Sequence, residues 1–186
     1  MKQGLALMLS LWALQVSALE VAGVSVADKA KVGASELVLN GAGIRTRVVF
    51  KVYVGALYLA EKTSAAADAL AQQGAKRMAL TMLRELSAQQ LNEAFENGIR
   101  ANHGAAEVEM LKPRIAELLA LFTDAKTGDV ILLDFQPESG TVVTLNSVVK
   151  GKPIPGEDFY RALLRIWLGD KPVDGDLKKS LLGQAL

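Results

Sequence analysis

The fold is decided by the stretch NGAGIRTRVVFKVYVGALYL, residues 40–59. Its first four residues, Asn40-Gly41-Ala42-Gly43, are typical of a turn, because Asn and Gly tolerate the backbone conformations that turns require. The chain then resumes an extended pattern with Arg45 and Arg47 on one face. Residues 50–59 are almost all β-branched, aromatic or small and apolar, which predicts a central strand covered on both faces.

Strands and helices are predicted on both sides of this stretch. Ser87 and Gln90 form a capping-box pair at the start of a helix that Gly104 ends. Pro113 lies within the next helix, over 106–122, and could divide it into two pieces. Further strands are predicted over 36–40, 77–83, 129–135, 141–145 and 146–152, with a short edge strand or hairpin in 19–35, and further helices over 65–73, 157–168 and 176–182. This order predicts an α+β domain with helices on one face of a mainly antiparallel sheet.

The N-terminus has the layout of a cleavable secretory signal. One positive charge precedes a short apolar run over residues 4–14, and Val16 and Ala18 are small residues suitably placed before a cleavage point. The alternative, a membrane anchor, is disfavoured because a spanning helix needs roughly 20 apolar residues. The sequence therefore predicts a signal peptide over 1–18 and one domain over 19–186, with no membrane span after cleavage.

The composition excludes several classes of chemistry. The sequence has no cysteine, which rules out disulfides, thiolate metal sites and a cysteine nucleophile. The single histidine, His103, cannot form a multi-histidine metal site, and its place beside Gly104 suggests a capping or surface role. A net charge of +1 without a Lys/Arg block argues against nucleic-acid binding. We expect no cofactor and no metal, and the oligomeric state is left open. An exported chain without disulfides favours the bacterial periplasm.

Four segments together resemble the chalcone isomerase family. In the first, a Gly-Ala-Gly-Ile-Arg turn ending at Arg45 leads into a strand that ends in Tyr58-Leu59. The others, in the family's order, are Arg84-Glu85-Leu86-Ser87, Gly156-Glu157-Asp158-Phe159-Tyr160 and Asp176-Leu177-Lys178-Lys179. The resemblance covers most of the chain after the signal, and it is greatest to the exported bacterial branch of chalcone isomerase-like proteins.

This resemblance implies an open-faced β-sandwich, in which a long curved sheet carries helices on one side and a cleft lies between them. In the plant enzymes of the family, the cleft closes a phenolate onto a conjugated ketone. In the fatty-acid-binding relatives, the same cleft holds an acyl chain, with its carboxylate on an arginine.

The resemblance also implies four candidate ligand-binding residues: Arg45, Tyr53, Leu91 and Asn97. Arg45 matches the family's active-site arginine, which can hold a carboxylate with two hydrogen bonds or stabilise an oxyanion; the alternative is an ordinary exposed strand arginine. Tyr53 stands where the plant enzymes have a threonine, and it could equally be a tyrosine packed in the core. Leu91 replaces a tyrosine and cannot donate a hydrogen bond. Asn97 lies one position from the family's helix asparagine, off the face of Leu91 and Phe95, and the alternative is a solvated helix residue.

Three functions remain open. The leading hypothesis is a periplasmic protein that binds a small apolar ligand with an acidic head, such as a fatty acid, on Arg45. Val52, Val54, Phe95 and Trp167 are expected to line or support the cleft. The alternatives are an intramolecular lyase or isomerase that acts on a conjugated carbonyl compound, with Arg45 as its catalytic residue, and a non-catalytic accessory protein of the cell envelope.

Overall fold

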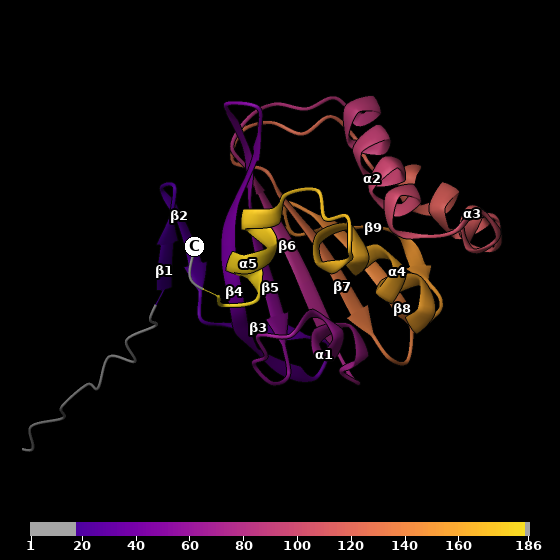
Figure 1. The fold of residues 1–186 in the computed structure, drawn as a ribbon, viewed down its shortest axis with the longest axis horizontal. Coiled ribbons are helices and arrows are strands. Elements are labelled where there is room, and N and C mark those ends of the chain that lie inside the picture. Colours follow the sequence, from indigo (N-terminus) through magenta and orange to yellow (C-terminus); the bar gives the residue numbers. More distant parts are fainter. Residues whose placement is uncertain (1–17, 185–186) are drawn as a thin grey trace, which may run out of the picture.

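A seven-stranded antiparallel sheet forms the centre of the molecule, and each strand pairs with the next along the chain (Figure 1). The computed structural model describes residues 18–184, so the predicted signal peptide lies outside the described residues except for Ala18. The strands of the sheet are β3 (Lys29–Val32), β4 (Ser35–Arg47), β5 (Phe50–Leu59), β6 (Lys76–Met82), β7 (Val130–Gln136), β8 (Gly140–Leu145) and β9 (Val148–Ile154). The predicted antiparallel sheet, the central strand and the hairpin of β7 and β8 are confirmed.

Strand β4 passes straight through the segment predicted as a turn, so that prediction is wrong. Asn40-Gly41-Ala42-Gly43 is extended and pairs with β5, where Gly43 stands opposite Gly55. The glycines are required by packing, because helix α5 (Gly175–Leu181) lies on this part of the sheet. A Cβ atom on Gly41 would collide with the carbonyl oxygen of Ser180.

Asn40 lies at a β-bulge of β4 rather than at a turn. Its buried side-chain amide donates to the carbonyl oxygens of Leu181, at 2.7 Å, and of Thr63, at 3.0 Å. Its Oδ1 atom accepts a hydrogen bond of 2.8 Å from the Thr63 N–H. These three bonds join β4, the segment after β5 and the end of α5, and they satisfy an amide that would be costly to bury alone.

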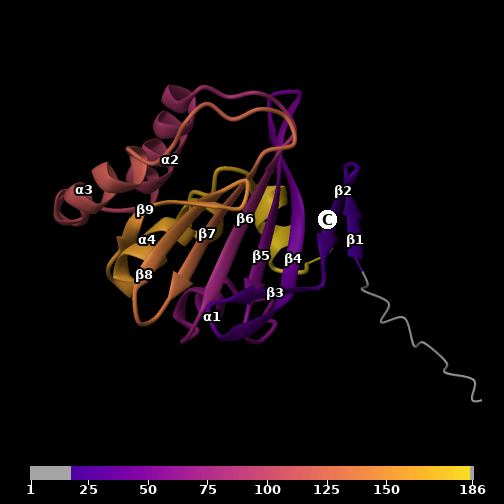
Figure 2. The ribbon, with the colours of Figure 1, turned by 180° about the vertical axis from the view of Figure 1, so that it is seen from behind.

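The five helices of the described residues lie on one side of the sheet, as predicted (Figures 1 and 2). Besides α5 they are α1 (Ala66–Ala71), α2 (Ala88–Asn102), α3 (Ala105–Leu119) and α4 (Glu157–Leu168). Three aromatic rings pack at their centre: the Phe95 centroid lies 4.6 Å from that of Phe122 and 5.9 Å from that of Trp167. Within residues 18–184, no helix is long and apolar enough to cross a membrane.

The helix boundaries follow local chemistry. Ser87 Oγ accepts a hydrogen bond from the Gln90 N–H, and Gln90 Oε1 accepts one from the Ser87 N–H, which confirms the predicted capping box. Pro113 does not divide α3. Its missing N–H removes one helical hydrogen bond, but Leu111 and Ile115 on either side of it are buried, and this packing keeps the helix continuous.

The opposite face of the sheet is buried by a hairpin of two further strands, β1 (Ala18–Val21) and β2 (Val24–Ala27), together with the curl of β3. Val54 belongs to this second apolar cluster, so the expectation that it supports the cleft is wrong. Alternate residues of a strand point to opposite faces, and Val54 follows Tyr53, which points to the helices.

Candidate functional site

A cleft of about 810 Å³ opens at one end of the sheet, between the β4–β5 hairpin, α2 and the segment that leads into α5. Its volume lies within the roughly 300–1,000 Å³ typical of small-molecule sites. Its apolar walls include Val52 of the sheet, Ala94 of α2 and Val173 before α5. Residues far apart in the sequence therefore meet at one concave surface.

Arg45 faces this cleft because of its place on β4. Gly43 faces α5, and Arg45, two residues on, points to the same side of the sheet. The guanidinium carbon of Arg45 lies 5.5 Å from the ring centroid of Tyr53, its cross-strand neighbour. Its Nε atom is buried and has no hydrogen-bond partner within residues 18–184. Arg45 is thus a partly desolvated cation that still lacks an acceptor.

Three further cations line the cleft: Arg47, Arg84 and Lys171. Among the described residues, Glu93 is the one carboxylate of the lining, and none of the ion pairs includes any of the four cations. The excess positive charge favours an anionic ligand, because an anion would not have to break an existing ion pair among the described residues in order to bind these cations.

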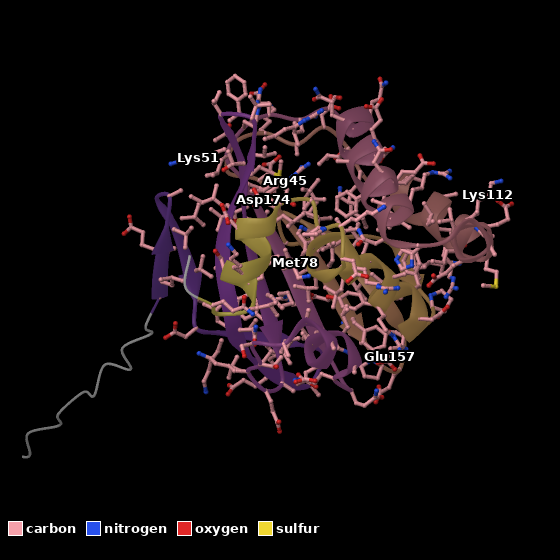
Figure 3. All side chains as sticks on the ribbon, viewed as in Figure 1. Arg45, Lys51, Met78, Lys112, Glu157 and Asp174 are labelled. Atoms are coloured by element: carbon pink, nitrogen blue, oxygen red, sulfur yellow. The ribbon has the colours of Figure 1, made fainter. Side chains whose placement is uncertain are left out.

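Asp174 holds in place the segment Lys171-Pro172-Val173 that forms the third side of the cleft, and Figure 3 labels it together with Arg45. Its Oδ2 atom accepts a hydrogen bond of 2.9 Å from the Thr46 N–H of β4. Its Oδ1 atom accepts bonds from the Asp176 and Leu177 N–H groups, which caps the start of α5. One carboxylate therefore binds the segment carrying Lys171 to the strand carrying Arg45.

The four predicted site residues are divided by the structure. Arg45 and Asn97 lie on the wall of the same cleft. Tyr53, 5% exposed, and Leu91 lie behind the wall in the core. The Tyr53 hydroxyl accepts a hydrogen bond of 2.8 Å from Trp167 Nε1, and burial raises the pKa of Tyr53 to about 12 against an opposing effect of Arg45.

The space beneath the cleft is filled by side chains. Leu91, Phe95 and Trp167 are all buried in the helix-side core, so they support the floor of the cleft and do not line it. Val52 does line it, as expected. A ligand would consequently rest in the mouth between sheet and α2 and would not extend deep between the layers.

Arg84 and Lys171 are site residues that the sequence reasoning missed. A signal for Arg84 was present, because β6 pairs antiparallel with β5 and the residues after β6 must return to the end of the sheet where Phe50 lies. The Arg84 guanidinium carbon indeed lies 5.0 Å from the Phe50 ring centroid. No local pattern marks Lys171. Its backbone is held at the cleft by two hydrogen bonds of 2.9 Å with the Asn102 side chain of α2, and the nearby Asp174 binds the same segment to β4.

His103 is a buried residue at the end of α2, so a surface role is wrong, whereas its position as the C-terminal cap residue agrees with the prediction. Its Nε2 atom donates to the Ala162 carbonyl oxygen over 3.1 Å, and its Nδ1 atom lies 3.0 Å from Glu107 Oε1. Within residues 18–184, no three histidine or acidic side chains lie together in a way that could hold a metal ion.

A curled antiparallel sheet with helices on one side, and a cationic cleft between the two layers, defines an open-faced α+β sandwich. The sequence matches the chalcone isomerase-like family over residues 18–183, and the chain belongs to this family. Among solved structures it is similar to a fatty-acid binding protein of Arabidopsis thaliana (AtFAP1), with a TM-score of 0.65 and 15% identity over 86% of this chain and 92% of that chain. A comparison with curated proteins gives no match. The predicted fold class is confirmed.

Proposed function

We propose that this protein binds a small apolar ligand with an acidic head, such as a fatty acid, in the cleft beside Arg45. The observation that carries the proposal is the group of four cations, Arg45, Arg47, Arg84 and Lys171, which lack ion-pair partners among the described residues and surround a partly apolar cleft. The name of the similar Arabidopsis protein supports the same class of ligand.

The chemistry of the head group follows from Arg45. A guanidinium holds a carboxylate with two parallel hydrogen bonds, and such bonds are strongest where water is excluded. Arg45 lines the cleft, and its buried Nε has no partner among the described residues, so the guanidinium is the expected anchor for the carboxylate.

The apolar part of the ligand would lie along α2. Ala94 and Ala101 both line the cleft from α2, seven residues apart, and their small side chains leave room between the helix and Val52 on the sheet. We expect an extended chain there, because the aromatic side chains below close the interior.

The test is a pair of ligands with the same chain, dodecanoate and dodecanol, titrated into the protein by calorimetry. We expect the acid to bind at least about tenfold more tightly than the alcohol, and Arg45→Ala to remove this difference, because a charge-assisted pair contributes on the order of 1.5–3 kcal/mol. Arg45→Lys should keep part of it, since lysine retains the charge without the planar fork.

Arg100→Ala is the matched control, because Arg100 lies on the same protein outside the cleft and pairs with Glu96. This variant should bind dodecanoate like the wild type. Equal affinity for acid and alcohol in the wild type, or unchanged binding by Arg45→Ala, would contradict the proposal. Failure to bind either compound would favour an accessory role in the cell envelope.

An intramolecular lyase or isomerase is the alternative. Such a reaction needs donors at the developing oxyanion. Leu91 offers none, and the Tyr53 hydroxyl is buried in the core, where it accepts a hydrogen bond from Trp167 and does not line the cleft. Turnover of a chalcone by the wild type that is lost in Arg45→Ala would nevertheless establish this alternative over simple binding.

We further propose that the protein belongs to the exported bacterial branch of the family and acts in the periplasm. The proposal rests on the charge, apolar run and small residues of the first eighteen positions and on the lack of cysteine.

A further inference from the structure

We infer that the tip of the β4–β5 hairpin docks on a bilayer surface that carries anionic phospholipid. The hairpin tip is Arg47-Val48-Val49-Phe50-Lys51, where β4 ends and β5 begins. In Figures 1 and 2 the hairpin reaches the upper edge of the molecule, level with the upper end of α2. The docking goes beyond ligand binding in the cleft and does not depend on it.

The hairpin tip presents three consecutive apolar side chains to solvent. Val48 is 88% exposed, Val49 is 76% exposed and Phe50 is 57% exposed. Val48 also has a positive φ of 59°, which is rare for a β-branched residue. A contiguous exposed apolar group of this kind is typical of an interaction surface.

The charges around the hairpin tip select the partner. Arg47 and Lys51 flank the apolar residues, and the guanidinium of Arg84 lies over the Phe50 ring. None of these cations belongs to an ion pair of the described residues. Apolar side chains flanked by Lys and Arg suit the interface of an anionic bilayer, where the former enter the acyl boundary and the latter meet phosphate groups.

A second copy of the chain is a poorer occupant for this surface. In a twofold-symmetric dimer whose axis passes beside the hairpin tip, Arg47 and Lys51 of both copies would be brought together. Like charges at close range oppose such a contact, whereas the phosphates of a bilayer neutralise them.

The hairpin tip also forms the rim of the cleft, because Arg47, Val48 and Phe50 are among the residues that line it. Docking would therefore turn the mouth of the cleft toward the bilayer. An acidic amphiphile could then move between the membrane and Arg45 without crossing water. This last step alone rests on the proposed function.

The experiment is flotation of the purified protein with vesicles of phosphatidylcholine alone and with vesicles of equal parts phosphatidylcholine and phosphatidylglycerol. Intact mass first establishes the N-terminus, so that all variants share it. We expect binding to the anionic vesicles that weakens as salt is added. Val49→Ser with Lys51→Glu should weaken it by at least about tenfold, since each cation near an anionic surface contributes measurably.

The matched control is Met110→Ser with Lys112→Glu on α3. Met110 is 71% exposed and Lys112 is also exposed, so the control removes the same charge and one exposed apolar side chain. Figure 3 places Lys51 and Lys112 at opposite ends of the molecule. The control should float like the wild type.

Three outcomes would overturn the inference. The wild type could bind equally to both vesicle types, or the two double variants could lose vesicle binding to the same extent. The hairpin-tip variant could also change its oligomeric state while its vesicle binding stays intact. Because flotation needs no fatty acid in the cleft, loss of dodecanoate binding would leave the docking result standing, and failure to float would leave the ligand result standing. Unchanged thermal melting of each variant shows that the fold is retained.

Discussion

At the scale of single residues, the buried pair of Tyr53 and Trp167 decides how Arg45 is held. The Trp167 indole N–H donates to the Tyr53 hydroxyl across 2.8 Å, which joins α4 to β5. The Tyr53 ring in turn lies beside the Arg45 guanidinium. Tyr53 therefore supports the cleft wall from within the core, and its hydroxyl oxygen accepts a hydrogen bond there and does not face the cleft.

Replacing Tyr53 with phenylalanine should lower the free energy of unfolding by about 1–3 kcal/mol, because the buried Trp167 N–H loses its acceptor. The loss should also change the dependence on pH. The pKa of Tyr53 is about 12 in the folded protein against 10.0 as its ordinary value. Its contribution to stability is full below pH 10.0 and is lost as the pH rises toward 12. Between these pH values, the free energy of unfolding of Tyr53→Phe should therefore fall less steeply with pH than that of the wild type. Urea unfolding at several pH values measures both effects.

Tyr160 also has a raised pKa because it is buried, so the comparison must be made between variant and wild type. The double variant with Trp167→Phe provides the control for the hydrogen bond. If Tyr53→Phe is as costly in that background as in the wild type, the indole bond is not the cause of the loss.

At the scale of elements, β4 and β5 form a glycine-lined groove that receives α5. Gly41, Gly43 and Gly55 all face this helix, and an added Cβ atom would meet Ser180 or Leu177 at the first two. The close approach brings Asp174, the cap of α5, to Thr46 on the strand next to Arg45. The position of the cleft thus depends on residues that have no side chain at all.

Gly41→Ala should destabilise the protein by about 1–3 kcal/mol, because the new methyl group meets backbone atoms of α5 that cannot move away locally. Urea unfolding is the measurement. Gly175→Ala is the control, because a Cβ atom there meets no atom within 4 Å, and it should stay within roughly 0.5 kcal/mol of the wild type. Equal effects of the two substitutions would mean that the groove is not tightly packed.

Strands β4 and β5 show which features of the fold can be predicted from the sequence and which cannot. The strand over 50–59 was predictable because burial on both faces leaves a direct trace, an apolar run that only Lys51 interrupts. The glycines at 41 and 43 were misleading, because a glycine needed for close packing looks the same in sequence as a glycine needed for a turn. Arg45 was found through its family motif. Lys171 was not, because Asn102, which holds its backbone at the cleft, lies 69 positions away in the chain.

At the scale of the whole molecule, the two faces of the sheet are buried by different parts of the chain. Helices cover one face, and the hairpin of β1 and β2 covers part of the other. In that hairpin Leu19 pairs with Val26 and Val21 with Val24. Removal of a signal peptide after Ala18 would leave these pairs in place, so the expected mature N-terminus is compatible with the fold.

Expression of the full chain in a bacterial host should yield the protein in the periplasmic extract with an intact mass that corresponds to Leu19–Leu186. Ala18→Lys should block processing, because the cleavage site requires a small residue. The control is Lys29→Ala, which exchanges the same two residue types at a position well after the cleavage site. This variant should be processed normally. Recovery from the cytoplasm with Met1 or Lys2 still present would contradict export.

The bond between Thr46 and Asp174 has a consequence for biogenesis. It joins residues 128 positions apart. Thr46, on the β4 wall of the cleft, is synthesised early, whereas Asp174 is synthesised near the end of the chain, so the cleft is complete only then. A nascent polypeptide therefore has no finished pocket. Under the proposed function, a ligand could be loaded only after nearly the whole domain has been synthesised.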